Sequence, residues 1–331
     1  MTEPAGGQEQ NTDRAKTGLS ISVLVPALNE EKNIARLLDN IFSQDLGNGL
    51  DLNEVIVISD GSTDATESEV RRKCAEHDSL RLLVNEKRLG KAACINIGKE
   101  GVTDDYLILV DGDIRLGGPM TLNRLVDGLD SRTGMAGGIP VPVLDARGLA
   151  PRIFIYWDIL RDCIRRNLNG GSNLYSAHGR ILALSRNLYD GLETPKLEQG
   201  NKVLSTDQFL YYSCINANLE FVLKPDAKVL FKLPTSFKDY LLVSVRFMYS
   251  ATNTTEFFDD KRFNSEFHVP LKLKVGAMLH LIKSKPFGAV EWLGYRVAAR
   301  SIYVYQRYFK KEEVGAAWQV SESTKGDITD M

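Results

Sequence analysis

Two aspartates that flank a glycine directly after an apolar segment are the first candidates for chemistry. Asp111 and Asp113 enclose Gly112 and follow the run YLILV at 106–110. Carboxylate oxygens are the ligands that Mg²⁺ and Mn²⁺ prefer, and these ions keep open positions for phosphate oxygens and water. A single DxD also occurs in solvated turns. Asp60, which follows a second apolar run, favours the metal site if both segments are neighbouring strands.

The segments that must position these carboxylates alternate between strand and helix patterns. β-Branched runs occur at 21–25, 54–59, 81–84 and 106–110, and apolar residues recur at helical spacing between them. Four strand–helix units predict a mostly parallel sheet with right-handed crossovers and helices on both faces. The second helix should begin at Asp64, with Glu67 as the reciprocal partner of a capping box.

In such sheets, ligands bind beyond the carboxyl ends of the strands, so the four following loops should share one edge. Each of these loops contains polar residues or glycine. They are Pro26 to Glu31, Asp60 to Asp64, Arg88 to Lys91 and Asp111 to Asp113.

The alternation stops after Gly138. Beyond it the patterns predict a helix at 153–168, a strand at 178–185, and a helical segment that begins near 205–210. Two further strands (221–223 and 228–231) and helical sequence at 237–249 and 271–309 should follow.

Composition excludes several functional classes. The net charge of −2 and pI near 6.2 give no global attraction to nucleic acid, so no nucleic-acid partner is expected. The four cysteines form no CxxC pair, and we expect them to be reduced and buried in a reducing compartment. Without a signal peptide or a long apolar segment, the sequence predicts a cytoplasmic protein, either soluble or peripheral at the inner face of the cell membrane.

Residues 271–311 contain nine Lys or Arg residues against the single acid Glu291, together with many aliphatic and aromatic residues. Basic amphipathic helices of this kind bind the interface of anionic membranes. The same pattern is expected of two helices that pack on a catalytic domain and expose basic faces to solvent. Both interpretations stay open at this point.

Five motifs together resemble the family 2 glycosyltransferases of the GT-A fold. They are VPALNEE (25–31), SDGSTD (59–64), LGKAACIN (89–96), DGD (111–113) and STDQFL (205–210). The resemblance implies an α/β, Rossmann-like, mostly parallel sheet flanked by helices, with a C-terminal helical extension. It also implies an inverting transfer of a sugar from a nucleotide-diphosphate sugar to an acceptor hydroxyl. A UDP-sugar donor and a role in cell-surface glycan or glycolipid synthesis are favoured.

The resemblance also assigns roles to individual residues. Asp207 would be the general base, and Asp113 with Asp111 would hold a divalent metal, Mn²⁺ or Mg²⁺. The nucleotide-sugar would contact Pro26, Ala27, Asn29, Glu30, Asp60, Gly61, Lys91, Asp111 and Gly112. A saccharide or lipid-linked acceptor would contact His178, Gly179 and Arg246. Without the resemblance, Asp207 would be read as a helix N-cap and His178 as a structural histidine.

The same resemblance divides the chain into segments. Residues 1–18 would be a disordered tail, and 19–235 the catalytic domain, with a nucleotide-sugar half (19–140) and an acceptor half (141–235). Residues 236–313 would form the basic helical region and 314–331 a polar tail. Processive members of the family carry a QxxRW motif, of which the stretch 243–247 retains only Arg246. Addition of a single sugar is therefore favoured over polymerisation.

Three other functions are weighed against sugar transfer. A non-catalytic nucleotide-sugar-binding module would not need all of Asp60, Asp111, Asp113 and Asp207. A nucleotidyltransferase would normally carry a Gly-rich, basic phosphate loop after the first strand, where this chain has PALNEE. An NAD-type oxidoreductase is disfavoured because no GxGxxG follows that strand.

Overall fold

A computed structural model describes residues 18–143, 149–195, 205–234, 236–254, 265–266 and 268–310. In chain order its elements are β1 (Leu19–Ala27), α1 (Ile34–Phe42), β2 (Leu50–Asp60), α2 (Thr66–Cys74), β3 (Leu80–Asn85), α3 (Lys91–Gly98), β4 (Tyr106–Val110), β5 (Ile114–Leu116), α4 (Thr121–Val126), β6 (Thr133–Val143), α5 (Leu149–Asn167), η1 (Asn169–Gly171), β7 (Ile181–Ser185), α6 (Arg186–Tyr189), α7 (Thr206–Asn216), β8 (Glu220–Lys232), α8 (Phe237–Thr254), α10 (Leu271–Ser284), α11 (Pro286–Val304) and η2 (Tyr305–Lys310).

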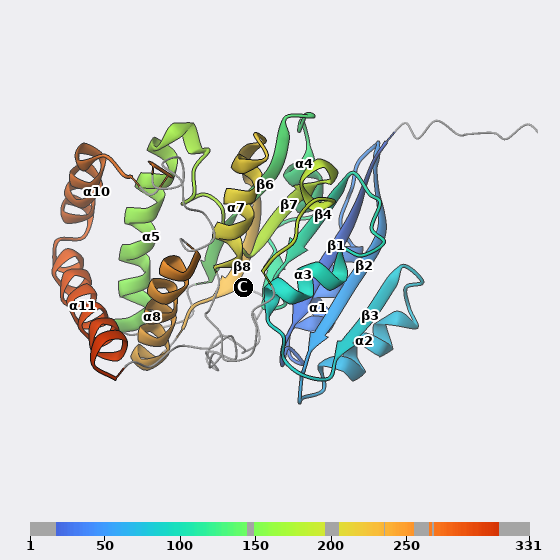
Figure 1. The fold of residues 1–331 in the computed structure, drawn as a ribbon, viewed down its shortest axis with the longest axis horizontal. Helices are drawn as coiled ribbons and strands as arrows, with labels where there is room; N and C mark the ends of the chain where they lie inside the picture. The colour runs from blue at the N-terminus through green and yellow to red at the C-terminus, as the bar shows by residue number, and fades with distance from the viewer. Residues whose placement is uncertain are drawn as a thin grey trace, which may run out of the picture.

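One eight-stranded sheet in the order β3-β2-β1-β4-β7-β6-β8-β5 forms the centre of the protein (Figure 1). The strands β3, β2, β1 and β4 are parallel to their neighbours, as the alternating pattern predicts. Strand β7 is antiparallel to both β4 and β6, whereas β6 and β8 are parallel. The expected α/β architecture, with its mostly parallel sheet and C-terminal helices, is therefore confirmed.

Side chains that alternate along the strands fill a separate core on each face of the sheet. On β1, Ile21 and Val23 pack with α1 residues such as Leu38, whereas Leu24 points to the opposite face. That second face is covered by α3 and α7, which contribute Ile95 and others. Because helices cover both faces of the sheet, water is excluded from these faces. The polar loops therefore lie at the ends of the strands.

Three local predictions need correction. Asp64 Oδ1 accepts from the N–H of Thr66 (3.0 Å), the first residue of α2. The Glu67 carboxylate, however, accepts from Ser59 Oγ (3.0 Å) and closes no capping box. Strand β6 was not expected because its glycines interrupt the apolar pattern. The two strands expected at 221–223 and 228–231 are one strand, β8, whose pairing with β6 shifts in register between them.

The cysteine prediction holds for two of the four residues. All four are free thiols, but only Cys94 and Cys214 are buried, whereas Cys74 and Cys163 are half-buried. Burial raises the pKa of the Cys94 and Cys214 thiols, so both stay protonated at neutral pH.

Gly138 on β6 marks a close approach of two strands, and its substitution gives a stability prediction. A Cβ at this position would lie 2.3 Å from Ala227 O and 2.7 Å from Ile181 Cγ2. Because a backbone oxygen cannot move aside cheaply, we expect Gly138→Ala to lower the free energy of unfolding by about 1–3 kcal/mol, measured by urea titration. Gly191→Ala, where a Cβ meets nothing within 4 Å, is the control. Equal unfolding midpoints for both variants would contradict the expected clash.

Helix α5 connects the sheet to the C-terminal helices. It packs between the sheet and the pair α10–α11, which forms the outermost layer at one end of the molecule (Figure 1). Tyr156 and Leu160 of α5 pack against Ala277 and Leu281 of α10. Tyr156 also occupies the space beside Gly288 of α11, where a Cβ would lie 2.4 Å from its ring. The helices α10 and α11 are thus joined to the rest of the protein through α5.

Candidate active site

The loops after β1 and β2 are tied to each other at the carboxyl edge of the sheet. Asn29, at φ 55°, accepts from the N–H of Thr63 through its Oδ1 (2.8 Å). The N–H of Glu30 donates to Thr66 Oγ1 (2.7 Å). The Glu30 side chain is 3% exposed and lies under Gly112, where a Cβ would come within 3.0 Å of its Cγ. Asn29 and Glu30 therefore stabilise the edge, and their direct contact with a nucleotide stays a prediction.

The Asp60 carboxylate holds the third loop in place. Its Oδ1 accepts from Asn85 Nδ2 (3.0 Å) and the N–H of Leu89 (2.8 Å), and its Oδ2 accepts from the N–H of Gly90 (2.8 Å). Gly61, at φ +72°, allows the Arg88 backbone to approach, since a Cβ would lie 2.7 Å from its nitrogen. This network aligns the start of α3, and therefore Lys91, with the site.

Lys91 joins the third loop to the loop after β4. Its Nζ donates to Gly179 O at 2.6 Å and forms an ion pair with Asp111 Oδ1, and both side chains are partly exposed. The N–H of Asp111 donates to Arg180 O (3.1 Å). The expected donor-side residues Lys91, Asp111 and Gly112 are thus brought together with the expected acceptor-side residue Gly179.

Asp207 lies on the other side of Gly179. A Cβ on this glycine would be 3.3 Å from Lys91 Nζ and 3.6 Å from Asp207 Cβ, so both side chains border the same residue. Ser205, not Asp207, is the N-cap of α7, and its Oγ donates to Asp207 Oδ1 (2.6 Å). Oδ1 also accepts from the N–H of Gln208 (3.1 Å). Within the described residues, no protein donor bonds to Oδ2, which leaves this oxygen available to accept a proton.

Asp111 and Asp113 fit a cation that is only partly coordinated by protein. They supply two carboxylates on either side of Gly112, at the end of β4 where the other loops converge. Mg²⁺ and Mn²⁺ sites commonly combine one or two carboxylates with substrate phosphates and water. The donor set therefore suits a divalent metal that arrives with a diphosphate.

Sequence reasoning missed three arginines on the acceptor side. Arg161 of α5 lies close to Asp207, to Arg165 of the same helix and to Arg180, which follows the predicted pair His178–Gly179. His178 Nε2 is 3.1 Å from Arg180 Nη1, and burial together with these arginines holds the pKa of His178 well below its usual range. The sequence offered one weak signal for these residues. Arg161 and Arg165 lie four residues apart, on one side of the predicted helix 153–168. The side chain of Arg246, predicted to face the acceptor, lies outside the described residues.

Comparison with known proteins supplies independent information. The sequence model described as Glycosyl transferase family 2 matches residues 22–192, more than half of the chain. The chain is 33% identical over 93 residues to Glycosyltransferase GlyA of Streptococcus pneumoniae serotype 4, covering 28% of this chain and 13% of that protein. It is 33% identical over 125 residues to glucosyl-3-phosphoglycerate synthase of Mycobacterium tuberculosis, covering 37% and 38%. The matches thus span less than half of either relative.

Among solved structures, the mannosyltransferase PcManGT from Pyrobaculum calidifontis, in complex with GDP-Man and Mn²⁺, is similar to this protein with a TM-score of 0.58. The two chains are 20% identical, and the match covers 89% of this chain and 88% of that one. At this identity the likeness concerns the fold, and it extends over the helical C-terminal region as well as the sheet.

Proposed function

The chain belongs to glycosyl transferase family 2, and from this premise we propose that it transfers a single sugar from a nucleotide-diphosphate sugar to an acceptor hydroxyl with inversion. The observation that carries the proposal is the meeting of Lys91, Asp111 and Asp207 around Gly179. It supports the proposal because a cation suited to a diphosphate and a carboxylate suited to the acceptor proton border the same residue.

Each group has a distinct task in this proposal. Asp207 accepts the acceptor proton through Oδ2, while Ser205 fixes Oδ1. Lys91 stabilises negative charge on the diphosphate, and Asp113 with Asp111 would hold the metal. When bound, a divalent metal supplies Lewis-acid stabilisation of the departing nucleoside diphosphate. Asp60 and Gly61 keep the pocket-forming loops in register, and a UDP donor stays the favoured choice.

A nucleotide-release assay tests this function. UDP-, GDP- and dTDP-sugars would be offered with Mn²⁺, Mg²⁺ or EDTA, with and without a membrane-lipid and saccharide extract as the acceptor source. We expect one donor to release its nucleotide in a metal-dependent manner, and faster with the extract. If every donor bound but none turned over, the non-catalytic binding module would replace the transferase. Pyrophosphate release from a nucleoside triphosphate and sugar phosphate would instead favour the nucleotidyltransferase.

We also propose that α10 and α11 dock on an anionic membrane. Their outer side exposes large apolar side chains directly to solvent, with Leu279 60%, Phe287 84% and Val290 72% exposed. These residues recur at helical spacing and lie opposite the buried residues Ala277, Leu281 and Tyr295. A stripe of this kind inserts shallowly into the boundary between headgroups and acyl chains. Among the described residues, no helix is both long and apolar enough to cross a membrane.

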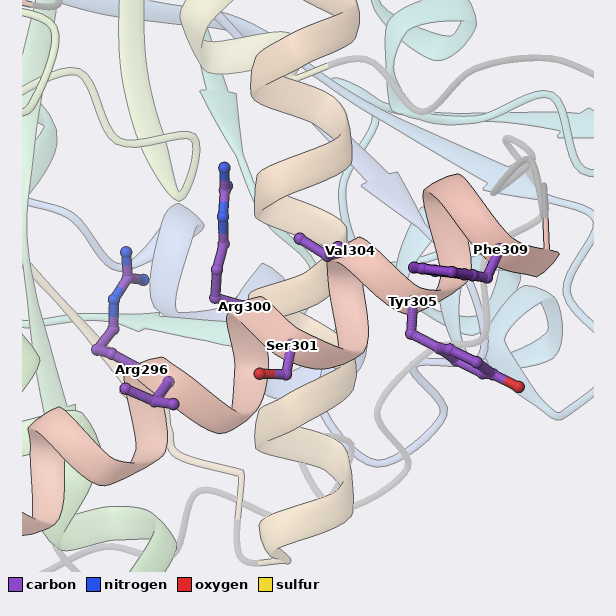
Figure 2. A pocket seen from close by; sticks show the side chains of 7 residues that line it. Arg296, Arg300, Ser301, Val304, Tyr305 and Phe309 are labelled. Carbon is purple, nitrogen blue, oxygen red and sulfur yellow. The ribbon is translucent and has the colours of Figure 1, made fainter.

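Basic side chains beside this stripe favour lipid over a second copy of the chain. Arg296, Arg300 and Arg307 lie along one flank of α11 and η2, and the one acid of this helix, Glu291, is paired with Arg152. A two-fold dimer through this face would oppose like charges. Arg296, Arg300, Tyr305 and Phe309 line a shallow pocket of about 640 Å³. Figure 2 shows Arg296 and Arg300 projecting from α11, and the rings of Tyr305 and Phe309 stack.

Vesicle co-sedimentation tests the docking. We expect the protein to sediment with phosphatidylcholine vesicles that contain phosphatidylglycerol, less so without it, and less at high salt, because each basic residue near the surface contributes about 1 kcal/mol. Val290→Asp should weaken binding at least tenfold. Val84→Asp, at an exposed valine on β3, should not change it. Equal binding of both variants would show that the apolar stripe does not contact lipid.

A further inference from the structure

Arg161 lies near Asp207 and near Arg180. In the part of the chain that the structure describes, neither guanidinium group pairs with a carboxylate. Arg161 donates from both Nε and Nη2 to one carbonyl, Tyr175 O, at 3.1 and 3.0 Å. Arg180 donates instead to the His178 ring, and its guanidinium lies 3.7 Å above the centre of the Phe231 ring. Both side chains are therefore fixed in orientation before any ligand binds.

Arg161 remains charged although it is partly buried. Burial lowers the pKa of Arg161 to about 10, and the nearby Asp207 and Asp158 oppose this shift, so the group is protonated at neutral pH. Arg180 Nε is buried without a hydrogen-bond partner. His178 is neutral, so it cannot compensate the guanidinium charge.

The neighbouring acids leave this positive charge only partly balanced. Asp111 is paired with Lys91, and Asp207 accepts from Ser205 and from its own helix. Burial raises the pKa of Asp158, although the nearby Arg161, Arg165 and Arg180 oppose this shift. Holding guanidinium groups away from water without a bidentate carboxylate is costly, and a ligand anion would offset that cost.

We propose that the acceptor carries an anionic group, a phosphate monoester or a carboxylate, which Arg161 and Arg180 bind so that its hydroxyl faces Asp207. This rests on the proposed transferase function, because it assigns the acceptor side of the same site. Guanidinium groups match the planar oxygen pairs of such anions and bind them more specifically than lysine does. The anion would come either from a soluble phosphorylated compound or from the headgroup of a lipid.

Calorimetry on the full chain tests the inference, in the presence of UDP and Mn²⁺. The probes are glycerol 3-phosphate, glycerate, glycerol, and monomeric short-chain lysophosphatidic acid, which keeps one free hydroxyl. We expect glycerol 3-phosphate and glycerate to bind at least tenfold more tightly than glycerol. A soluble source predicts that glycerol 3-phosphate binds best, and a lipid source predicts that lysophosphatidic acid does. Both results support the anion site.

Variants localise the binding. Arg161→Gln and Arg180→Gln should each weaken anion binding at least tenfold. Arg161→Lys, which keeps the positive charge, should retain part of the wild-type affinity. Arg166→Gln is the matched control, because Arg166 lies on the same helix but is 71% exposed in its side chain. Urea unfolding would identify a glutamine variant that fails to fold. The other glutamine variant would then show whether the arginines bind the anion. The affinity for UDP with Mn²⁺ should stay within twofold in every variant.

Two results would overturn the inference. One is equal affinity for glycerol and glycerol 3-phosphate, and the other is anion binding that neither glutamine variant weakens. If wild type bound none of UDP, GDP and dTDP, the proposed function would fail by itself. If a nucleotide bound normally but the anions did not, only the acceptor assignment would fail.

Discussion

Replacing Asp207 with asparagine should reduce sugar transfer by about 10²- to 10⁴-fold, the usual contribution of a positioned general base. Asparagine has the same shape and keeps an Oδ1 that can accept from Ser205 Oγ, so α7 should begin unchanged. It cannot accept a proton at the position of Oδ2. The measurement is extract-dependent nucleotide release at saturating donor, together with donor affinity, which should be unaffected.

Asp190→Asn provides the control for this experiment. Asp190 is an exposed carboxylate at the end of α6, away from Gly179. Loss of transfer in Asp207→Asn alone would assign the base, whereas similar rates in both variants would return Asp207 to a structural role at the start of α7. A variant that lost donor binding along with transfer would indicate a disturbed site rather than a missing base.

The regular part of the fold was predictable because its signals are local. Strands such as β1 and β4 are continuous β-branched runs, and α1 has apolar residues at strict helical spacing. The loops at their ends could then be placed on one edge by topology alone. Strand β6 was not predicted because Gly134, Gly137 and Gly138 interrupt its apolar pattern. At each of these positions a Cβ would lie within 3.0 Å of a neighbouring atom, a tertiary constraint that no local pattern reveals.

The acceptor side was harder to predict for the same physical reason. Arg161 and Asp207 lie far apart in sequence and come close only through the tertiary arrangement of α5 and α7. The motifs identified Asp207, His178 and Gly179 but gave no reason to select Arg161 among the arginines of α5. Its half-buried position and its bond to Tyr175 O distinguish it from the exposed Arg166, and both features are tertiary.

Asp113→Ala should abolish the response of the protein to Mn²⁺ or Mg²⁺. One of the two carboxylates beside Gly112 would be lost, and Asp111 alone is already paired with Lys91. We expect nucleotide release to fall about 10²-fold or more, corresponding to the loss of several kcal/mol of charge stabilisation. Calorimetry of UDP with and without Mn²⁺ gives a second measurement that does not depend on turnover.

The matched control for that experiment is Asp51→Ala, because Asp51 is an exposed aspartate at the opposite end of β2. Wild type and Asp51→Ala should bind UDP more tightly with Mn²⁺ than with EDTA, whereas Asp113→Ala should bind it equally in both. If EDTA left the wild-type rate unchanged, Lys91 would have to stabilise the diphosphate without a metal. Lys91→Met would then become the more damaging substitution, since its Nζ is the cation nearest to Asp111 and Gly179. The relative rates of the Asp113 and Lys91 variants therefore decide which charge the leaving group depends on.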